Sequence, residues 1–358
     1  MRKRRYCVLL SVQFIICLFN FQLFAISLVE YPSIGIYFNQ DNPVELVTYL
    51  PKNYVKDGSK DYTEHLQKGL NENNYVCLPD FPVKVNSNGL KLKSNQVVIF
   101  QNNSKLLMAA NSLKRYAILQ VWGIKNTRII NPTLIGDRDK HIGNVGEWGM
   151  GINIVGSHNI EVVNPNIINC WGDGIYIGQN NNIPSSEIII KGGKIDKSRR
   201  NGISITSAKN VNIDGLTISN TKGINPRQGI CIEPNNSNDV IENLVIKNLK
   251  TISNEGGGIG IILPMLLSSK QKNVSIKIDR HVDNSSQFGV AIQGFKGKPG
   301  QRSLLGSIEI TNSSWNNNKQ SLFVKPDFYN SYAPKLKVEN SKSMRSGKMI
   351  NSSFKNHL

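Results

Sequence analysis

Hydrophobic and polar residues alternate in short stretches along most of this chain, with the apolar positions two residues apart. Such a period is typical of strands that bury one face. Six stretches carry a glycine as their second residue, at spacings of 23 to 31 residues, and self-similarity at this spacing indicates a stacked repeat. They are "MGINIVG" (150–156), "DGIYIGQ" (173–179), "NGISITS" (201–207), "QGICIEP" (228–234), "GGIGIIL" (257–263) and "FGVAIQG" (288–294). The pattern predicts one solenoid rung per repeat, with the isoleucines in aligned interior columns.

A second alternating stretch follows the first within most repeats, as in "NIEVV" (159–163) and "NVNIDG" (210–215). No repeat contains a helix-length stretch of 3.6-residue period, which excludes leucine-rich and helical solenoids. A propeller would need several antiparallel strands and hairpin turns in each blade. The sequence therefore predicts an all-β protein, a right-handed parallel β-helix with asparagine and glycine at its corners.

The stretch "DYTEHLQKGL" (61–70) has a different pattern. Asp61 and Glu64 resemble a capping box, and Leu66 with Leu70 forms a short apolar stripe. We expect a short helix here that covers the first rung, whose core would otherwise be exposed. The resulting domain prediction is an extended lead-in at 28–60, the capped β-helix at 61–345 and a C-terminal tail at 346–358.

The first 27 residues have the features of a signal peptide. Four basic residues precede a largely apolar segment, and Ala25-Ile26-Ser27 has the small-x-small pattern of a cleavage site. An uncleaved anchor is the alternative, but Gln13, Asn20 and Gln22 disfavour a stable span. We expect a secreted or periplasmic protein with no stable membrane span after cleavage.

The chain is basic, with 43 Lys and Arg against 25 Asp and Glu and a net charge of +18. Removal of the four basic leader residues leaves 39 against 25, or +14. This excess favours a polyanionic partner. Nucleic acid is not expected, because no basic helix or nucleic-acid motif is present. We expect an acidic polysaccharide and a monomeric protein. Cys77, Cys170 and Cys231 form neither a disulfide framework nor a metal knuckle.

Polar residues gather on the rungs between 173 and 233, at positions that face outward from the strands. Asp173 precedes one of the repeat glycines directly. The neighbouring columns add substrate-binding candidates and one acid, namely Tyr176, Arg200, Asn201, Arg227 and Glu233.

The similarity of "NTRIINPTLI" (126–135) to "NIEVVNPNII" (159–168) sets the register between two adjacent repeats. That register brings Asp137 and Asp139 within about 5–8 Å of Asp173, since adjacent rungs lie about 4.8 Å apart. An insertion at 139–148 then interrupts the rung, and loops on rigid scaffolds often carry binding groups. It supplies His141, Glu147 and Trp148, and Trp171 follows on the next rung. We predict a functional cleft here, with the tryptophans stacking on sugar rings.

The helix-like "DYTEHLQKGL" and "VCLPDF" followed by Gly-Ile-x-Ile rungs resemble the pectin-lyase-like superfamily of parallel β-helix proteins over roughly residues 60–345. The resemblance is specific for fold and not for reaction. Within that superfamily the rungs are most similar to polygalacturonase-type hydrolases, which carry Asn-Thr-Asp, Asp-Asp, Gly-His-Gly and Arg-Ile-Lys. The corresponding residues here are Gly149-Met150-Gly151, Asp173-Gly174, Asn201 in place of the histidine, and Cys231-Ile232-Glu233. Only Asp173 matches, so a true polygalacturonase is not expected.

Three functions stay open at this point. A glycoside hydrolase needs two carboxylates, which Asp173 with Asp137, Asp139 or Glu233 would supply, and this reading is slightly favoured. A polysaccharide lyase or uronate epimerase would use Arg200 or Arg227 to neutralise or deprotonate a uronate, and its carboxylates would hold Ca²⁺. A non-catalytic glycan-binding β-helix would keep the arginines and tryptophans without needing the acids. No cofactor is otherwise expected.

Overall fold

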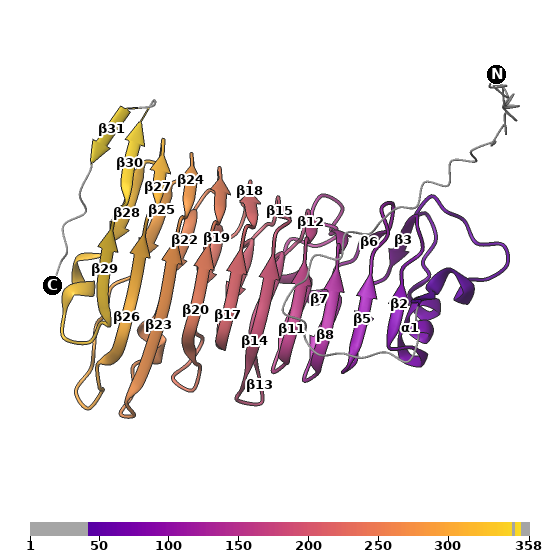
Figure 1. Ribbon diagram of the computed structural model, residues 1–358, viewed down its shortest axis with the longest axis horizontal. Coiled ribbons are helices and arrows are strands. Elements are labelled where there is room, and N and C mark those ends of the chain that lie inside the picture. Colours follow the sequence, from indigo (N-terminus) through magenta and orange to yellow (C-terminus); the bar gives the residue numbers. More distant parts are fainter. Residues whose placement is uncertain (1–41, 346–347, 352–358) are drawn as a thin grey trace, which may run out of the picture. The chain divides into compact units, whose positions relative to one another are not determined.

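The computed structural model describes residues 42–345 and 348–351, which form a right-handed parallel β-helix of about ten turns (Figure 1). The predicted fold class is confirmed. The expected signal peptide, the first part of the lead-in and most of the expected tail lie outside the described residues. Among the residues described, no helix is both long enough and apolar enough to cross a membrane.

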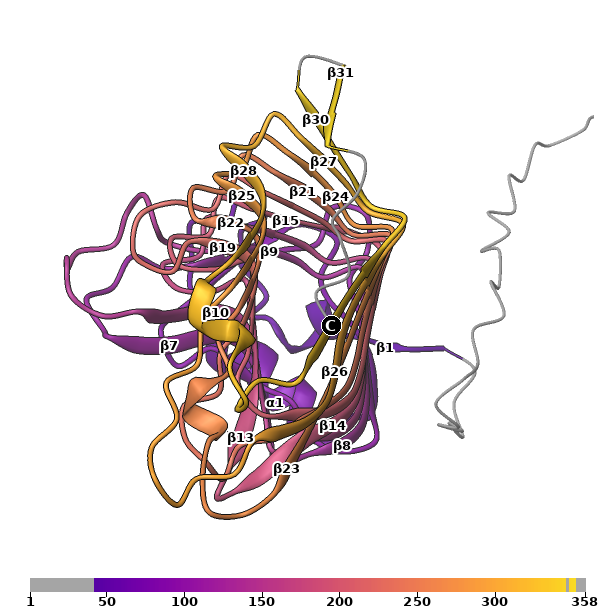
Figure 2. The same cartoon turned by 90° about the vertical axis from the view of Figure 1, so that its left-hand side faces the viewer.

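Each full turn adds one strand to each of three parallel sheets, here named A, B and C. Figure 2 shows the strands of successive turns superposed around a common interior. Sheet C, which carries the glycine-initiated repeats, consists of β4 (Leu90–Lys91), β7 (Arg115–Trp122), β10 (Trp148–Val155), β13 (Ile175–Asn180), β16 (Ile203–Ile205), β19 (Gln228–Ile232), β22 (Gly257–Ile261), β25 (Phe288–Ile292) and β28 (Gln320–Val324).

Sheet A follows sheet C within each turn. Its strands are β1 (Val44–Glu45), β2 (Tyr75–Cys77), β5 (Gln96–Ile99), β8 (Lys125–Ile130), β11 (His158–Val163), β14 (Ile183–Lys191), β17 (Ala208–Asp214), β20 (Ile241–Lys247), β23 (Lys272–Asp279), β26 (Leu304–Thr311) and β29 (Lys335–Glu339). Sheet B closes the turn with β3 (Pro82–Val85), β6 (Lys105–Met108), β9 (Thr133–Ile135), β12 (Asn166–Ile168), β15 (Lys194–Asp196), β18 (Thr217–Ser219), β21 (Lys250–Ile252), β24 (Val282–Asn284), β27 (Ser314–Asn316) and β30 (Lys342–Arg345).

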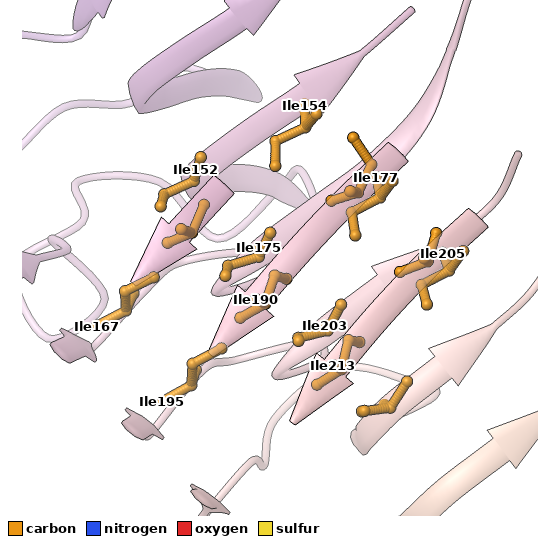
Figure 3. Packing of buried hydrophobic residues seen from close by; sticks show 14 of the residues in the cluster. Ile152, Ile154, Ile167, Ile175, Ile177, Ile190, Ile195, Ile203, Ile205 and Ile213 are labelled. Carbon is orange, nitrogen blue, oxygen red and sulfur yellow. The ribbon is translucent and has the colours of Figure 1, made fainter. Parts of the chain in front are cut away.

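The predicted register is the observed one. Ile152 pairs with Ile175, which pairs with Ile203, and the column continues through Ile230 and Ile259. The eight isoleucines expected inside are all 0 % exposed: Ile152, Ile154, Ile175, Ile177, Ile203, Ile205, Ile230 and Ile232. Figure 3 shows six of them pointing into the interior together with isoleucines of sheets A and B. Their burial supplies the main driving force for stacking the turns.

Asparagines form a bend near the start of several sheet A strands. Asn126, Asn159, Asn210 and Asn243 all adopt left-handed backbone, with φ between 52° and 57°, a conformation that asparagine tolerates better than most residues. Asn159 Nδ2 donates to Asn126 Oδ1 at 2.8 Å, and Asn243 Nδ2 donates to Asn210 Oδ1 at 2.7 Å. The side-chain amides thereby link one turn to the next.

A polar chain crosses the interior near the C-terminal turns. Trp315 Nε1 donates to His281 Nδ1 at 3.2 Å, so the His281 proton lies on Nε2, which donates to Thr251 Oγ1 at 2.7 Å. The Thr251 hydroxyl in turn donates to Asp283 Oδ2. Burial lowers the pKa of His281 to about 3 and raises the pKa of Asp283. Every group of the chain points its donor toward the carboxylate.

The N-terminal end differs in detail from the prediction. The expected helix is α1 (Thr63–Glu72), and its residues Leu66 and Leu70 are buried in the core. Its N-cap is Tyr62, without a side-chain cap bond, so the capping box is not formed; Asp61 Oδ1 accepts from the Thr63 N–H instead. Residues 42–60 are not simply extended, because β1 and the 3-10 helix η1 (Leu46–Tyr49) place Leu46 in the core.

At the C-terminal end the rungs continue regularly to β29 and β30, and 3-10 helices η2 (Pro264–Leu266) and η3 (Pro326–Tyr329) lie in loops after sheet C strands. The strand β31 (Lys348–Asn351) pairs antiparallel with β30. Part of the segment expected as a tail therefore belongs to sheet B. The three cysteines of the described region, Cys77, Cys170 and Cys231, are buried free thiols.

Candidate active site

The glycine column of sheet C exists because the backbones of adjacent turns approach closely there. A Cβ at Gly174 would lie 2.5 Å from Ile195 Cγ2 and 2.7 Å from the Gly202 carbonyl oxygen. At Gly172 it would lie 2.3 Å from the carbonyl oxygen of Glu147. A side chain at either position would clash with a neighbouring segment of the protein, so glycine is required there. Asp173, which lies between the two glycines, is therefore closely surrounded by the protein.

Arg200 is the centre of the predicted cluster. Its guanidinium contacts three carboxylates: Glu233 at 3.1 Å, Asp173 at 3.3 Å and Glu147 at 3.4 Å. Burial lowers the pKa of Arg200, but Asp173 and Glu233 outweigh it and hold the pKa above its ordinary value. We call Glu147, Asp173, Arg200 and Glu233 the Arg200 cluster.

Exposure divides the three carboxylates into two kinds. The side chain of Asp173 is 0 % exposed, whereas those of Glu147 and Glu233 are 39 % and 32 % exposed. Asp173 Oδ1 accepts the Asn201 backbone N–H at 2.9 Å, and its other oxygen faces Arg200. Burial keeps the pKa of Asp173 above its ordinary value, although Arg200, Ser204 and Asn201 oppose this rise. Only the two glutamates are accessible to a ligand.

Asn201 has a structural position under the cluster and is buried. Its Nδ2 donates to Ser204 Oγ at 3.0 Å, and its Oδ1 accepts the Gln228 backbone N–H at 2.9 Å. Arg200 Nη1 also donates to Ser204 Oγ at 3.1 Å. The expectation that Asn201 contacts substrate is therefore wrong, because both ends of its amide are used within the protein.

Asp137 lies in a second, separate cluster. Its carboxylate accepts hydrogen bonds from Tyr116 Oη, from His141 Nδ1 at 2.9 Å and from Asn111 Nδ2 at 3.0 Å. Asp137 is 1 % exposed. The pKa of Tyr116 is raised mainly by burial and then by its hydrogen bond to Asp137 and the charge of that carboxylate. The Cys170 thiol is close enough to Asp137 and Asp173 that both add to the rise in its pKa that burial causes. Asp137 thus lies near Asp173 as predicted, but it is not accessible.

His141 belongs to an aromatic stack that holds the 139–148 insertion in place. Its ring stacks on the Trp171 ring with centroids 4.0 Å apart. The Arg199 guanidinium also lies over the Trp171 ring, 3.7 Å from the ring centroid. Arg199 Nη1 also donates to the Gly146 carbonyl at 2.8 Å. Trp171 is 8 % exposed, so it is a packing residue and not the sugar platform expected from the sequence.

Two further predicted residues lie outside the Arg200 cluster. Asp139 is exposed, and its carboxylate accepts a hydrogen bond from Asn169 Nδ2 at 2.8 Å. Arg227 pairs with Glu255 at 3.1 Å. The predictions that Asp139 is catalytic and that Arg200 and Arg227 grip one substrate acid together are not supported by these contacts, because each group has a different partner.

A cleft of about 280 Å³ opens beside the Arg200 cluster on strands β7, β10 and β13. It is lined by Arg115, Trp122, Trp148, Asn153, Tyr176 and Gln179, among others. Trp122 and Trp148 are 47 % and 37 % exposed. Tyr176 Oη accepts from Thr206 Oγ1 at 2.9 Å. We call this the tryptophan cleft; it contains the predicted residues Trp148 and Tyr176.

Arg115, Trp122 and Asn153 line the cleft but were not predicted from the sequence. The first two lie on "RYAILQVW" (115–122), which alternates but does not begin with glycine. Its register with "WGMGINIV" (148–155) pairs Arg115 with Trp148 and Gln120 with Asn153. Aligning strands by their apolar alternation alone would have found this rung.

The residues do not fit the Ca²⁺ ion considered for a lyase. Calcium requires several oxygen ligands around one point, and the point where the carboxylates of the Arg200 cluster converge is taken by the guanidinium. In the described ranges no group of three or more His, Cys, Asp and Glu side chains is arranged to hold a metal ion.

Comparison with known sequences finds two relatives and no matching family model. The chain is 25% identical over 233 residues to the SPbeta prophage-derived uncharacterized protein YorA of Bacillus subtilis (strain 168), covering 58% of this chain and 38% of that protein. It is 28% identical over 225 residues to the uncharacterized protein YclG of the same organism, covering 57% and 37%. The matched region spans little more than a third of either relative.

Solved structures share the fold at low sequence identity. An iota-carrageenase bound to iota-carrageenan fragments superposes with a TM-score of 0.65 at 11% identity, over 87% of this chain and 90% of that one. The tailspike gp49 of Acinetobacter baumannii bacteriophage Fri1, a capsular polysaccharide depolymerase, gives 0.53 at 12% identity over 88% and 65%. Endo-xylogalacturonan hydrolase from Aspergillus tubingensis gives 0.51 at 13% over 84% and 96%. The fold expected from the pectin-lyase-like resemblance is confirmed.

Proposed function

We propose that this protein cleaves an anionic polysaccharide by hydrolysis at the Arg200 cluster. The observation that carries the proposal is the pair of accessible glutamates, Glu147 and Glu233, on one guanidinium beside a cleft with exposed tryptophans. A solvated protein surface has no need for this combination. The fold shared with polysaccharide-degrading enzymes agrees with the proposal but does not carry it.

Glu147 and Glu233 act as the acid and base pair. Because both contact the same planar guanidinium, their nearer oxygens lie within about 9 Å of each other, compatible with the roughly 6.5–9.5 Å typical of inverting glycosidases. One carboxyl group protonates the leaving oxygen, and the other activates water. Arg200 and the buried Asp173 are positioning residues that hold the pair.

Hydrolysis is favoured over elimination by the engagement of Arg200. A lyase or epimerase needs a cation free to neutralise the substrate carboxylate beside the reacting carbon, and at the Arg200 cluster Arg200 already has three acidic partners, while Arg227 pairs with Glu255. The net charge of +18 supports an anionic substrate. The predicted signal peptide supports action outside the cytoplasm.

A non-catalytic glycan-binding protein is the second candidate. The observation that favours it is the same ion pairing, since Arg200 occupies an oxygen of both glutamates and leaves neither as a free base. Such a protein would bind polysaccharide in the tryptophan cleft without turnover.

The test is a panel of acidic and neutral polysaccharides incubated with the full chain. Product is read both as new reducing ends and as ultraviolet absorbance of a new double bond. Glu147→Gln and Glu233→Gln are compared with Glu242→Gln, a matched change at an exposed glutamate of sheet A that pairs with Lys209. Hydrolysis predicts reducing ends without a double bond, lost in the first two variants and kept in the third. Double-bond formation would show elimination, and binding without either product would show the non-catalytic function.

A further inference from the structure

The tryptophan cleft contains aromatic surface that the protein leaves exposed. Trp122 is the last residue of β7, and Trp148 is the first residue of β10, the adjacent strand. In register, Trp148 lies beside Arg115, seven residues before Trp122, so the Cα atoms of the two tryptophans are separated by roughly 23 Å along the strands. Tryptophan is enriched at interfaces, where its ring contacts apolar surface and its N–H can meet a polar partner. Both indoles therefore present surface to a ligand.

Between the two tryptophans lie buried amides with unpaired oxygens. Asn153 lines the cleft and is 9 % exposed, and its Oδ1 has no hydrogen-bond partner among the described residues. Gln120 lies beside it in register, is 6 % exposed and has an unpaired Oε1. Buried polar atoms are nearly always hydrogen-bonded. A hydroxyl-bearing ligand in the cleft would satisfy Asn153 directly.

Arg115 gives the cleft a positive charge that no acidic side chain of the described residues neutralises, unlike the charges of Arg200 and Arg227. Its guanidinium lies 4.7 Å from the centre of the Trp148 ring, and it makes no ion pair within residues 42–345 and 348–351. Arg200 and Arg227 by contrast are both paired with glutamates. No acidic side chain lines the cleft. An anionic group held here would face an unopposed cation in bidentate geometry.

One outward column of sheet C connects the tryptophan cleft with the Arg200 cluster. Trp148 follows Glu147 in the chain, and Asn153, Tyr176 and Ser204 occupy successive rungs of one outward column. Ser204 in turn hydrogen-bonds Arg200. A polysaccharide lying along this column would therefore reach the glutamates from the tryptophan cleft.

We propose that the tryptophan cleft binds a short segment of an acidic polysaccharide, several sugar residues long. Sugar rings stack on Trp122 and Trp148, Asn153 Oδ1 accepts a hydroxyl hydrogen, and Arg115 pairs with the carboxylate or sulfate ester. The proposal rests on the proposed function for the direction in which the substrate continues. It replaces Arg200 and Arg227 with Arg115 as the group that recognises the charge of the substrate.

The test measures binding of three oligosaccharides to the full chain by calorimetry: an oligogalacturonide, a sulfated galactan fragment and its neutral galactan counterpart. Arg115→Gln should lower the affinity for at least one of the two acidic ligands about tenfold, the scale of one charge-assisted contact. The affinity for that ligand should also depend less on salt concentration. The substitution should leave the affinity for the neutral ligand unchanged. Trp122→Ala should weaken every ligand that binds, and thermal unfolding confirms that each variant folds.

The matched control is Arg302→Gln, since Arg302 is an exposed arginine outside the cleft. Which acidic ligand responds to Arg115→Gln separates carboxylate from sulfate recognition. Unchanged affinity for both acidic ligands, or no binding of any ligand by the unmodified protein, overturns the subsite. If the unmodified protein binds through Arg115 without turnover, the subsite stands and the hydrolase fails. If it turns over and Arg115→Gln leaves KM unchanged, the hydrolase stands and the subsite fails.

Discussion

Replacing Asp173 by asparagine tests the distinction between buried and accessible carboxylates in the Arg200 cluster. The asparagine retains one oxygen that can accept the Asn201 N–H, now made at 2.9 Å. Its amide NH₂ then faces Arg200 Nη1, which at present donates to the carboxylate at 3.3 Å. Two donors oppose each other at a site that is 0 % exposed to solvent, and water cannot enter to separate them.

The expected loss is about 2–4 kcal/mol. Breaking a buried ion pair by removing one partner typically destabilises a protein by about 3–5 kcal/mol, and a hydrogen bond to a charged group contributes about 1.5–3 kcal/mol. The expected loss lies at or below the lower end of the ion-pair range because Arg200 keeps its ion pairs with Glu147 and Glu233. For a domain of this size the loss corresponds to a fall in Tm of roughly 5–10 °C.

The comparison variant is Glu233→Gln, whose side chain is 32 % exposed in the parent. Exposed ion pairs contribute about 0–1 kcal/mol, so its Tm should stay within about 3 °C of the parent. Its turnover, measured well below the Tm of both variants, should fall at least about a hundredfold as for the loss of a general acid or base. Thermal unfolding followed by circular dichroism provides both Tm values. An unchanged Tm for Asp173→Asn would refute the assignment of Asp173 as a positioning residue.

Three further changes test the fold. Ile203→Ala should lower the free energy of unfolding by about 2–5 kcal/mol, whereas Ile183→Ala, at a position 62 % exposed, should leave denaturant midpoints nearly unchanged; similar losses would contradict the interior column. Asn243→Gly should be tolerated better than Asn243→Ala, because φ is 52° there and alanine is strained by about 1 kcal/mol in that region; the two Tm values decide. The folded pKa of His281 is about 3 against 6.5 ordinarily, so the unfolded state binds the extra proton between these values. Stability should therefore fall as pH drops from about 6.5 to 3, and His281→Gln should reduce that slope; equal slopes in urea titrations would exclude His281.

The rungs could be predicted because their signal is local and repeated. Glycine at positions such as Gly174 and Gly202 is required by the close approach of adjacent backbones, and the isoleucines after each glycine follow a strict two-residue period. Each turn repeats the same physical problem, so one correct alignment fixes all the others. The capping box failed for the opposite reason, because a helix start depends on one residue, and Asp61, whose Oδ1 accepts the Thr63 N–H, lies one position before the N-cap Tyr62.

The site could be predicted only in part, because an outward position on a strand is not the same as an exposed one. Asp173, Asn201 and Ser204 all point away from the core, yet they are at most 1 % exposed. Arg200 lies over them and hydrogen-bonds Asp173 and Ser204. The choice of partner for Arg200 depends on the path of the 139–148 insertion, which brings Glu147 to it and which no period in the sequence describes.

Because Arg200 covers the outward residues of these rungs, it determines which side chains are accessible to a ligand. A carboxylate mounted directly on a rung becomes part of the support, as Asp173 and Asp137 do, each holding groups from a neighbouring segment. In the proposed mechanism the reactive groups come instead from segments that lie over the rungs: Glu147 is on the inserted loop, and Glu233 follows the end of β19. The insertion is fixed in turn by His141 on Trp171 and by Arg199 on Gly146. The aromatic residues predicted to bind sugar divide in the same way, since Trp171 clamps the loop and Trp148, carried by that loop's end, faces the cleft. The proposed chemistry at the Arg200 cluster therefore depends on how firmly the rigid rungs hold one loop, and the Trp171 stack contributes to the site by holding that loop.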